Sequence, residues 1–220
     1  MLPRLYVITD RASASEGSGG LVEATQASVA AGARMIQLRD KGSRPLRQWR
    51  LGQRLITALA GFGDCVLVVN DRADLAVALG ADGVHRSADS LPVTALRRVV
   101  EVPKLVGVSC HGVEDVVAAA EQGADFVTLS PIFETSSKPG YGPPLGVDAI
   151  EEAATLVDVP IFALGGVEPD AVADCLAYGA HGVAVMSGIM AADDPYEATA
   201  AYLERLDVRS CRRPSLRVNR

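Results

Sequence analysis

The sequence predicts one α/β domain in which eight parallel strands close into a barrel, each strand being followed by a helix. Three observations predict this fold: eight short apolar runs, a segment of helical periodicity after each run, and a motif that recurs after every second helix. The chain has 220 residues, so each unit averages about 27 residues, which suits a small (β/α)8 TIM barrel.

The recurring motif combines a helix end, a Gly-Ala pair and a short apolar run. Glycine after a helix provides a left-handed cap, and the β-branched residues that follow are typical of buried parallel strands. The four copies span residues 30–40, 78–87, 121–131 and 177–187.

Four further apolar runs alternate with these copies and complete the count of eight strands. They read LYVITD, CVLVVN, LVGVSC and IFALGG, at residues 5–10, 65–70, 105–110 and 161–166. Alternating units would also suit an open doubly wound sheet, but the count of eight and the paired repeat favour closure. We expect the barrel to occupy residues 1–208. Residues 209–220 are basic and lack periodicity, which predicts a disordered or loosely docked tail.

Composition and charge limit the classes of partner. A net charge of −6 argues against a general nucleic-acid surface but not against a small anionic ligand. No apolar segment approaches the roughly 20 residues that span a membrane, and the first ten residues lack the features of a signal peptide. The four cysteines form no C-x-x-C pair, which suits a reducing compartment. We therefore expect a cytoplasmic protein that binds small molecules, not membranes; a homo-oligomer is left open.

In such barrels the functional site lies at the carboxyl ends of the strands. All eight predicted strand ends are polar or glycine, although strands that exit into ordinary loops would also show polar residues. These end residues are Asp10, Arg39 and Asp40, Asn70 and Asp71, His85 and Arg86, Ser109 and Cys110, Ser130, Gly165 and Gly166, and Ser187.

Cationic and amide side chains gather after the second strand. In QLRDK, alternation places Gln37, Arg39 and Lys41 on one face of an extended segment. Arg39 offers a planar fork for phosphate, and Lys41 adds a point charge unless it is simply solvated. Lys138, in the Gly- and Pro-rich segment 129–146, either belongs to an ordinary solvated turn or closes over an anion as part of a mobile lid. Together these groups could surround a pyrophosphate.

Three other features suggest ligands. Asp71, beside Asn70, is either a helix N-cap or a ligand of Mg²⁺, which prefers one or two carboxylates with phosphate oxygens. Gly165 and Gly166 end the seventh strand next to Ser187, where barrels frequently hold phosphate on backbone N–H groups; simple turn geometry is the alternative. His85 ends the fourth strand and is as easily structural as functional.

The motifs together resemble the thiamine phosphate synthase and TenI superfamily. The segments that carry the resemblance are LYVITD, QLRDK, NDRADLAVALGADGVH, VGVSCH, GADFVTLSPIFETSSK, PLG and ALGGV. They occur in order from residue 5 to about residue 205, nearly the whole chain.

The resemblance implies a transferase of thiamine biosynthesis that joins hydroxymethylpyrimidine diphosphate to thiazole phosphate, with Mg²⁺ assisting release of pyrophosphate. The implied catalytic residues are Arg39, Lys138 and Ser109. The implied substrate-binding residues are Gln37, Lys41, Asn70, Thr135, Ser137, Gly166 and Ser187. The implied metal ligand is Asp71.

Two departures from the family pattern leave alternatives open. The synthases typically read HLGQxD, and the HRSADS here places Ser90 at the second metal-ligand position and Asp89 one residue earlier. A one-residue shift in this loop could make Asp89 the second metal ligand. A TenI-type thiazole tautomerase usually has a histidine where this chain has Pro131. The alternatives are a metal-free tautomerase and a noncatalytic barrel that binds a phosphate ligand. The transferase is favoured because Asn70 and Asp71, with the cations Arg39, Lys41 and Lys138, are together more than a metal-free isomerase needs.

Overall fold

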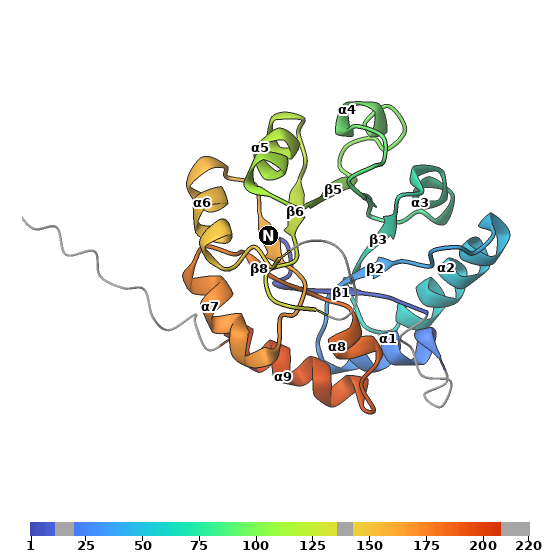
Figure 1. Ribbon diagram of the computed structural model, residues 1–220. Helices are drawn as coiled ribbons and strands as arrows, with labels where there is room; N and C mark the ends of the chain where they lie inside the picture. Colours follow the sequence, from blue (N-terminus) through green and yellow to red (C-terminus); the bar gives the residue numbers. More distant parts are fainter. Residues whose placement is uncertain (12–19, 136–142, 208–220) are drawn as a thin grey trace, which may run out of the picture.

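The computed structural model describes residues 1–11, 20–135 and 143–207. Its strands are parallel, pair in chain order, and form a closed barrel because β8 (Gly182–Val185) pairs with β1 (Leu5–Ile8). Helices form a ring around them (Figure 1). The predicted (β/α)8 barrel is therefore confirmed, whereas the predicted tail, 209–220, lies outside the described residues.

The strands are short, and their bounds are as follows: β1 Leu5–Ile8, β2 Met35–Leu38, β3 Val66–Asn70, β4 Gly83–Arg86, β5 Leu105–Cys110, β6 Phe126–Leu129, β7 Ile161–Ala163 and β8 Gly182–Val185. Each strand ends within two residues of the polar or glycine position that the sequence predicts for it.

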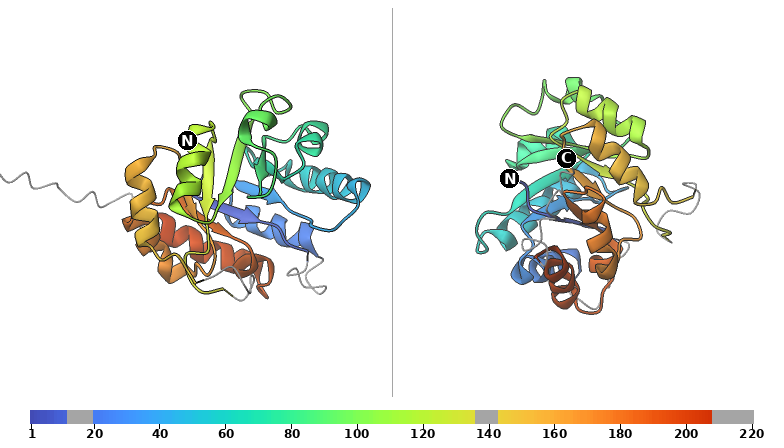
Figure 2. Two further views of the ribbon diagram at one scale, coloured as in Figure 1. Left: turned by 45° about the horizontal axis from the view of Figure 1, so that its top comes forward. Right: turned by 90° about the vertical axis from the view of Figure 1, so that its left-hand side faces the viewer.

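The helical elements are α1 Leu21–Ala31, α2 Pro45–Leu59, α3 Ala73–Leu79, α4 Val93–Leu96, α5 Val113–Glu121, α6 Asp148–Leu156, η2 Pro169–Ala171, α7 Val172–Ala177, α8 Ser187–Met190 and α9 Pro195–Asp207. The last helix, α9, packs beside α1 and so joins the end of the described chain to its beginning (Figure 2). Within the described ranges, no helix combines the length and apolar character needed to cross a membrane.

Alternation along β1 shows how the strands divide the core. Leu5 and Val7 pack in the cluster between strands and helices, whereas Tyr6 and Ile8 belong to a separate cluster inside the barrel. Side chains of the second cluster are Tyr6, Ile8, Met35, Val68, Phe126, Phe162 and Ala184. The barrel is thus filled by side chains up to the level at which its polar end begins.

Three aromatic rings fill the middle of the barrel. Tyr6 meets Phe126 edge to face, with centroids 5.5 Å apart, and Phe126 meets Phe162 in the same way at 5.8 Å. Gly107 on β5 makes room for them, because a Cβ there would lie 2.3 Å from Phe126 and 2.7 Å from His85 Nδ1. The rings form an apolar layer directly beneath the polar residues of the barrel.

Candidate active site

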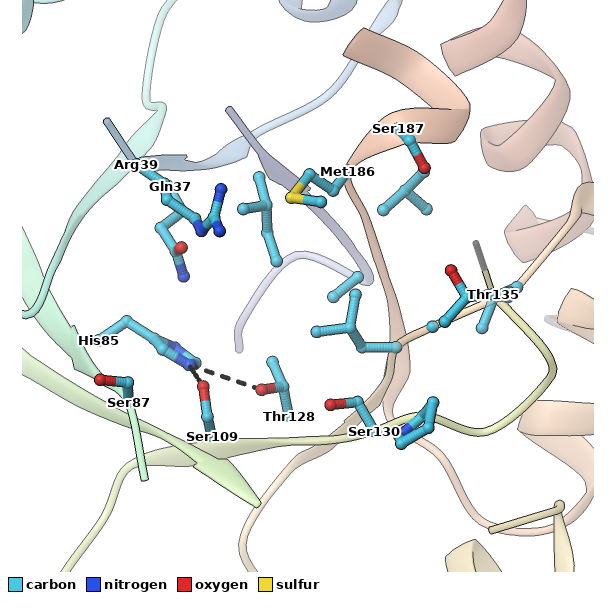
Figure 3. A pocket seen from close by; sticks show the side chains of 18 of the residues that line it. Gln37, Arg39, His85, Ser87, Ser109, Thr128, Ser130, Thr135, Met186 and Ser187 are labelled. Carbon is cyan, nitrogen blue, oxygen red and sulfur yellow. Dashed lines mark hydrogen bonds between the residues drawn. The ribbon is translucent and has the colours of Figure 1, made fainter. Parts of the chain in front are cut away.

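A pocket of about 300 Å³ opens at the carboxyl ends of the strands, on the rim that the sequence predicts (Figure 3). Most of the sequence-predicted residues line it: Gln37, Arg39, Lys41, Asn70, Asp89, Ser109, Thr135, Gly166 and Ser187. Asp71 instead lines a smaller adjoining hollow, which shares Lys41 and Asn70 with the first. Ser137 and Lys138 lie outside the described residues.

Arg39 is held in place from two directions. Its guanidinium Nη1 donates to Asp10 Oδ1 at 2.6 Å, and its backbone N–H donates to Thr9 Oγ1 at 2.8 Å. The Arg39 and Asp10 side chains are each less than one-fifth exposed, so this ion pair is better shielded than a surface pair. This geometry fixes the edge of the guanidinium that carries Nη1 and leaves other N–H groups for a ligand.

Asp71 caps the beginning of the loop after β4. Ser87 donates to Asp71 Oδ1 from its backbone N–H at 2.7 Å and from its hydroxyl at 2.8 Å. Asn70 Nδ2 donates to Asp71 Oδ2 at 2.9 Å. Asp71 also takes a positive φ of 58°, a conformation in which aspartate is enriched among the non-glycine residues. The carboxylate is therefore rigidly oriented and already accepts three donors.

Beneath the pocket, buried polar groups form a chain. Gln37 Nε2 donates to the Tyr6 hydroxyl at 2.8 Å. His85 Nε2 lies 3.0 Å from Ser109 Oγ, a contact that Figure 3 draws. Burial lowers the pKa of His85 to about 3 and raises that of Tyr6, so both groups are neutral near pH 7. The pocket floor is therefore uncharged, and its charge lies at the rim.

Backbone geometry dominates the opposite wall. Gly165 and Gly166 have φ values of 90° and 66°, which favour glycine. A Cβ on Gly166 would lie 2.3 Å from the Glu134 carbonyl oxygen, so this turn packs tightly against the segment that carries Thr135. Ser187 begins α8 beside it.

Sequence reasoning missed two residues that shape the pocket. Tyr6 carries an inward position of β1, and alternation in LYVI together with the register Ile8↔Gln37 could have placed it beneath Gln37. Ser87 orients Asp71, but nothing in the sequence links these residues, since the bond depends on the pairing of β3 with β4.

The sequence profile described as thiamine monophosphate synthase matches residues 5–189 of this chain. The chain belongs to this family. It is 41% identical over 200 residues to the thiamine-phosphate synthase of Roseiflexus castenholzii, covering 91% of this chain and 86% of the relative. It is 40% identical over 208 residues to a putative thiamine-phosphate synthase of Geobacter sulfurreducens, covering 94% and 95% of the two chains.

Solved structures agree with this family assignment. The thiamine phosphate pyrophosphorylase of Pyrococcus furiosus superposes with a TM-score of 0.82 at 28% identity, over 93% of this chain and 96% of that one. A 3-hexulose-6-phosphate synthase, at 22% identity and a TM-score of 0.66 over 92% and 99% of the two chains, shares the fold alone.

Two positions in or next to the pocket bear on the choice of activity: the second metal-ligand position expected of a synthase, and Pro131, where a TenI-type tautomerase usually has a histidine. Ser90 occupies the position expected for the second metal ligand, and Asp89, one residue earlier, lines the pocket. Pro131 also lines it, and His111 reaches the same wall, with Nδ1 2.8 Å from the Ser130 carbonyl oxygen.

Proposed function

We propose that this chain is a thiamine phosphate synthase that joins hydroxymethylpyrimidine diphosphate to thiazole phosphate and releases pyrophosphate. One observation carries the proposal beyond family membership: a single pocket unites a cationic wall, with Arg39 and Lys41, and a glycine-rich wall at Gly166. Two phosphorylated substrates need two anion sites, and the opposite walls offer one for each.

In this proposal the cationic wall holds the diphosphate. Arg39 binds its oxygens through the N–H groups that Asp10 does not use, and Asn70 donates from the neighbouring strand. Negative charge grows on the departing oxygen as the carbon–oxygen bond breaks, so preoriented cations favour the transition state over the ground state. The resemblance to the family assigns a further cation for the diphosphate to Lys138, a residue outside the described ranges.

The opposite wall holds the thiazole phosphate. Backbone N–H groups near Gly166 and Ser187 meet its oxygens, with Thr135 and Ser137 adding hydroxyls. Pyrophosphate leaves first with the electron pair of the carbon–oxygen bond, and the thiazole nitrogen then forms a bond to the methylene carbon of the resulting pyrimidine cation. The uncharged floor, with Gln37 and Ser109, orients the pyrimidine ring between the two anion sites.

The carboxylates suit Mg²⁺ shared with the diphosphate. Asp71 accepts three donors and so retains about one of roughly four lone-pair sites, while Asp89 is exposed on the pocket wall. In the described part of the chain no three metal-binding side chains cluster, so phosphate oxygens would complete the coordination. When bound, Mg²⁺ neutralises charge on the diphosphate.

One observation favours a second candidate, the thiazole tautomerase. That reaction needs an acid–base group, and His111 lines the pocket close to Pro131, where the tautomerases carry their histidine. It needs neither Arg39 nor a metal.

The deciding experiment incubates the purified chain with both substrates, with and without Mg²⁺, and detects thiamine phosphate. Formation that depends on Mg²⁺ supports the synthase. A parallel reaction supplies the thiazole phosphate carboxylate alone; isomerisation there, without thiamine phosphate in the first assay, would replace the synthase with the tautomerase. Binding of either ligand without turnover would leave a noncatalytic barrel.

A further inference from the structure

A series of hydrogen bonds joins Gln37 to Ser109 through Tyr6 and His85. It runs from Gln37 Nε2 to the Tyr6 hydroxyl at 2.8 Å, on to His85 Nδ1 at 3.5 Å, and from His85 Nε2 to Ser109 Oγ at 3.0 Å. Gln37, His85 and Ser109 line the pocket, whereas Tyr6 is fully buried. These residues come from β2, β1, β4 and β5, so the series crosses the barrel.

The bond between Gln37 and Tyr6 determines the direction of the other hydrogen bonds in this series. The two ring nitrogens of His85 face different hydroxyls, Nδ1 that of Tyr6 and Nε2 that of Ser109, and each hydroxyl can donate or accept. Among the described residues, the Tyr6 hydroxyl bonds only with Gln37 and His85. Since Tyr6 accepts from the Gln37 amide, its own hydrogen points to His85 Nδ1.

The histidine tautomer follows from that bond. An accepting Nδ1 leaves the hydrogen on Nε2, which donates to Ser109 Oγ. Ser109 then accepts on its buried side, and its own hydrogen is available to the pocket. Thr128 Oγ1, at 3.5 Å from the same Nε2, is a more distant acceptor.

Gln37 and Ser109 are therefore coupled. With its amide nitrogen turned to Tyr6, Gln37 offers its carbonyl oxygen to the pocket as an acceptor, while Ser109 offers a donor. Turning the Gln37 amide over would reverse every bond in the series at once. One residue thus accepts whenever the other donates.

We propose that Tyr6 is a positioning residue that acts through Gln37 and His85, making Gln37 an acceptor and Ser109 a donor toward the pocket. The site would select a heterocycle that turns an N–H to Gln37 and an unprotonated ring nitrogen to Ser109, as a 4-aminopyrimidine can. A pyrimidin-4-one presents a carbonyl and a ring N–H and so has the opposite polarity. This inference rests on the proposed function, in which a pyrimidine occupies the floor of the pocket.

The first test reads the tautomer directly. The chain contains three histidines, so ¹⁵N NMR of the labelled protein, with His85→Gln to assign the signal, shows which ring nitrogen of His85 carries the hydrogen. We expect Nε2 in the unmodified protein, and Tyr6→Phe should release Nδ1 and give a mixture of tautomers. A hydrogen on Nδ1 in the unmodified protein overturns the proposal.

The second test measures ligand polarity. Dissociation constants of 4-amino-2-methylpyrimidine and 2-methylpyrimidin-4-one are compared by NMR titration. We expect the amino compound to bind on the order of tenfold more tightly, since the oxo compound leaves polar groups unpaired. In Tyr6→Phe, which retains the ring packing, this ratio should fall toward one. An unchanged ratio in a folded Tyr6→Phe protein overturns the proposal.

Tyr202→Phe is the matched control. Tyr202 is as buried as Tyr6, and its hydroxyl donates to the Val167 carbonyl oxygen at 2.9 Å. This variant therefore loses a buried hydroxyl that takes no part in the hydrogen bonds between Gln37 and Ser109. Its amino-to-oxo ratio and His85 tautomer should match the unmodified protein. If Tyr6→Phe did not fold, the tautomer and the ratio in the unmodified protein would still decide the matter. Neither readout needs turnover, so failure of the synthase assay and failure of this inference are distinguishable.

Discussion

Arg39 and Asp10 form an ion pair at the mouth of the pocket, with Nη1 and Oδ1 2.6 Å apart. Asp10 orients the guanidinium, but its negative charge also opposes any anion that Arg39 binds. The pair therefore weakens the attraction between Arg39 and an anion, while it holds the guanidinium in one orientation.

The first prediction concerns this pair. Asp10→Asn retains an oxygen that accepts from Arg39 and removes the opposing charge. Affinity for inorganic pyrophosphate should rise about two- to fivefold, as expected for removing a partly screened charge. Isothermal titration calorimetry at two salt concentrations measures the effect, which higher salt should reduce.

Asp74→Asn is the control, because Asp74 also pairs with an arginine, Arg72, but lies exposed on α3. It should leave pyrophosphate affinity unchanged. Weaker binding in Asp10→Asn would mean that orientation of Arg39 depends on the full charge of the carboxylate.

The second prediction concerns the metal. Asp71→Asn should abolish Mg²⁺-dependent turnover and weaken Mn²⁺ binding in the presence of pyrophosphate by about tenfold or more, because an amide is a poorer ligand for a hard cation. Electron paramagnetic resonance of free Mn²⁺ measures this binding without turnover.

Asp89→Asn separates the two carboxylates. If Asp89 supplies the second ligand, this variant should also weaken Mn²⁺ binding while its melting temperature stays normal, since Asp89 is exposed. Unchanged metal binding and activity in Asp71→Asn would leave Asp71 with its structural role alone, as the acceptor for Ser87.

The third prediction tests the glycine wall with two glycines of equal φ. Gly166 and Gly80 both have φ 66°, but only Gly166 has backbone within the space of a Cβ, at 2.3 Å from the Glu134 oxygen. Gly166→Ala should weaken thiazole phosphate binding at least tenfold, because the turn must move away from the phosphate. Gly80→Ala shares the backbone strain and should lower the melting temperature without affecting that affinity. Equal affinities in the two variants would remove the phosphate from this turn.

Much of the fold was predictable, because parallel barrels repeat their local signals. The helix end, glycine and apolar run recur, and each copy marks a strand within two residues of its observed end. Polar residues at strand ends likewise indicated the rim, since all parallel strands end on the same side.

The contacts within the site were less predictable, because they join residues far apart in sequence. Ser87 meets Asp71 only because β3 and β4 pair, and Tyr6 meets His85 only because both point into a closed barrel. Residue type predicted which side chains could bind a ligand but not which partners already held them. Asp71 is the clearest case, since its place in the smaller hollow depends on those partners.

The fourth prediction concerns Lys138, which lies outside the described residues. If it meets the departing diphosphate, Lys138→Ala should lower kcat about a hundred- to a thousandfold, whereas a solvated lysine would contribute almost nothing. Lys138→Arg should restore activity only in part, since a planar fork differs from a compact ammonium. Near-normal kcat of Lys138→Ala, with both substrates saturating, would return this segment to an ordinary solvated loop.

The last prediction concerns acid stability. In the unfolded chain His85 takes up a proton near pH 6.5, but burial delays this to about pH 3 in the folded protein. Between these values the unfolded state binds more protons, so the free energy of unfolding falls as the pH falls, by at most about 1.4 kcal/mol per pH unit from this residue. Urea unfolding of the unmodified protein and of His85→Gln, at pH values from 7 to 4, gives the two slopes. We expect the slope of the variant to be shallower, whatever its stability at pH 7.

His181→Gln calibrates that comparison. Burial also lowers the pKa of His181, but this residue is only partly buried and lies at the opposite end of the barrel, with Nε2 3.0 Å from the Leu2 carbonyl oxygen. Its removal should therefore flatten the slope less than removal of His85. If the free energy of unfolding changed with pH at the same slope in the unmodified protein and in His85→Gln, His85 would take up its proton at the same pH in the folded and unfolded states. The conclusion that the His85 ring is neutral beneath the pocket at acidic pH would then be wrong.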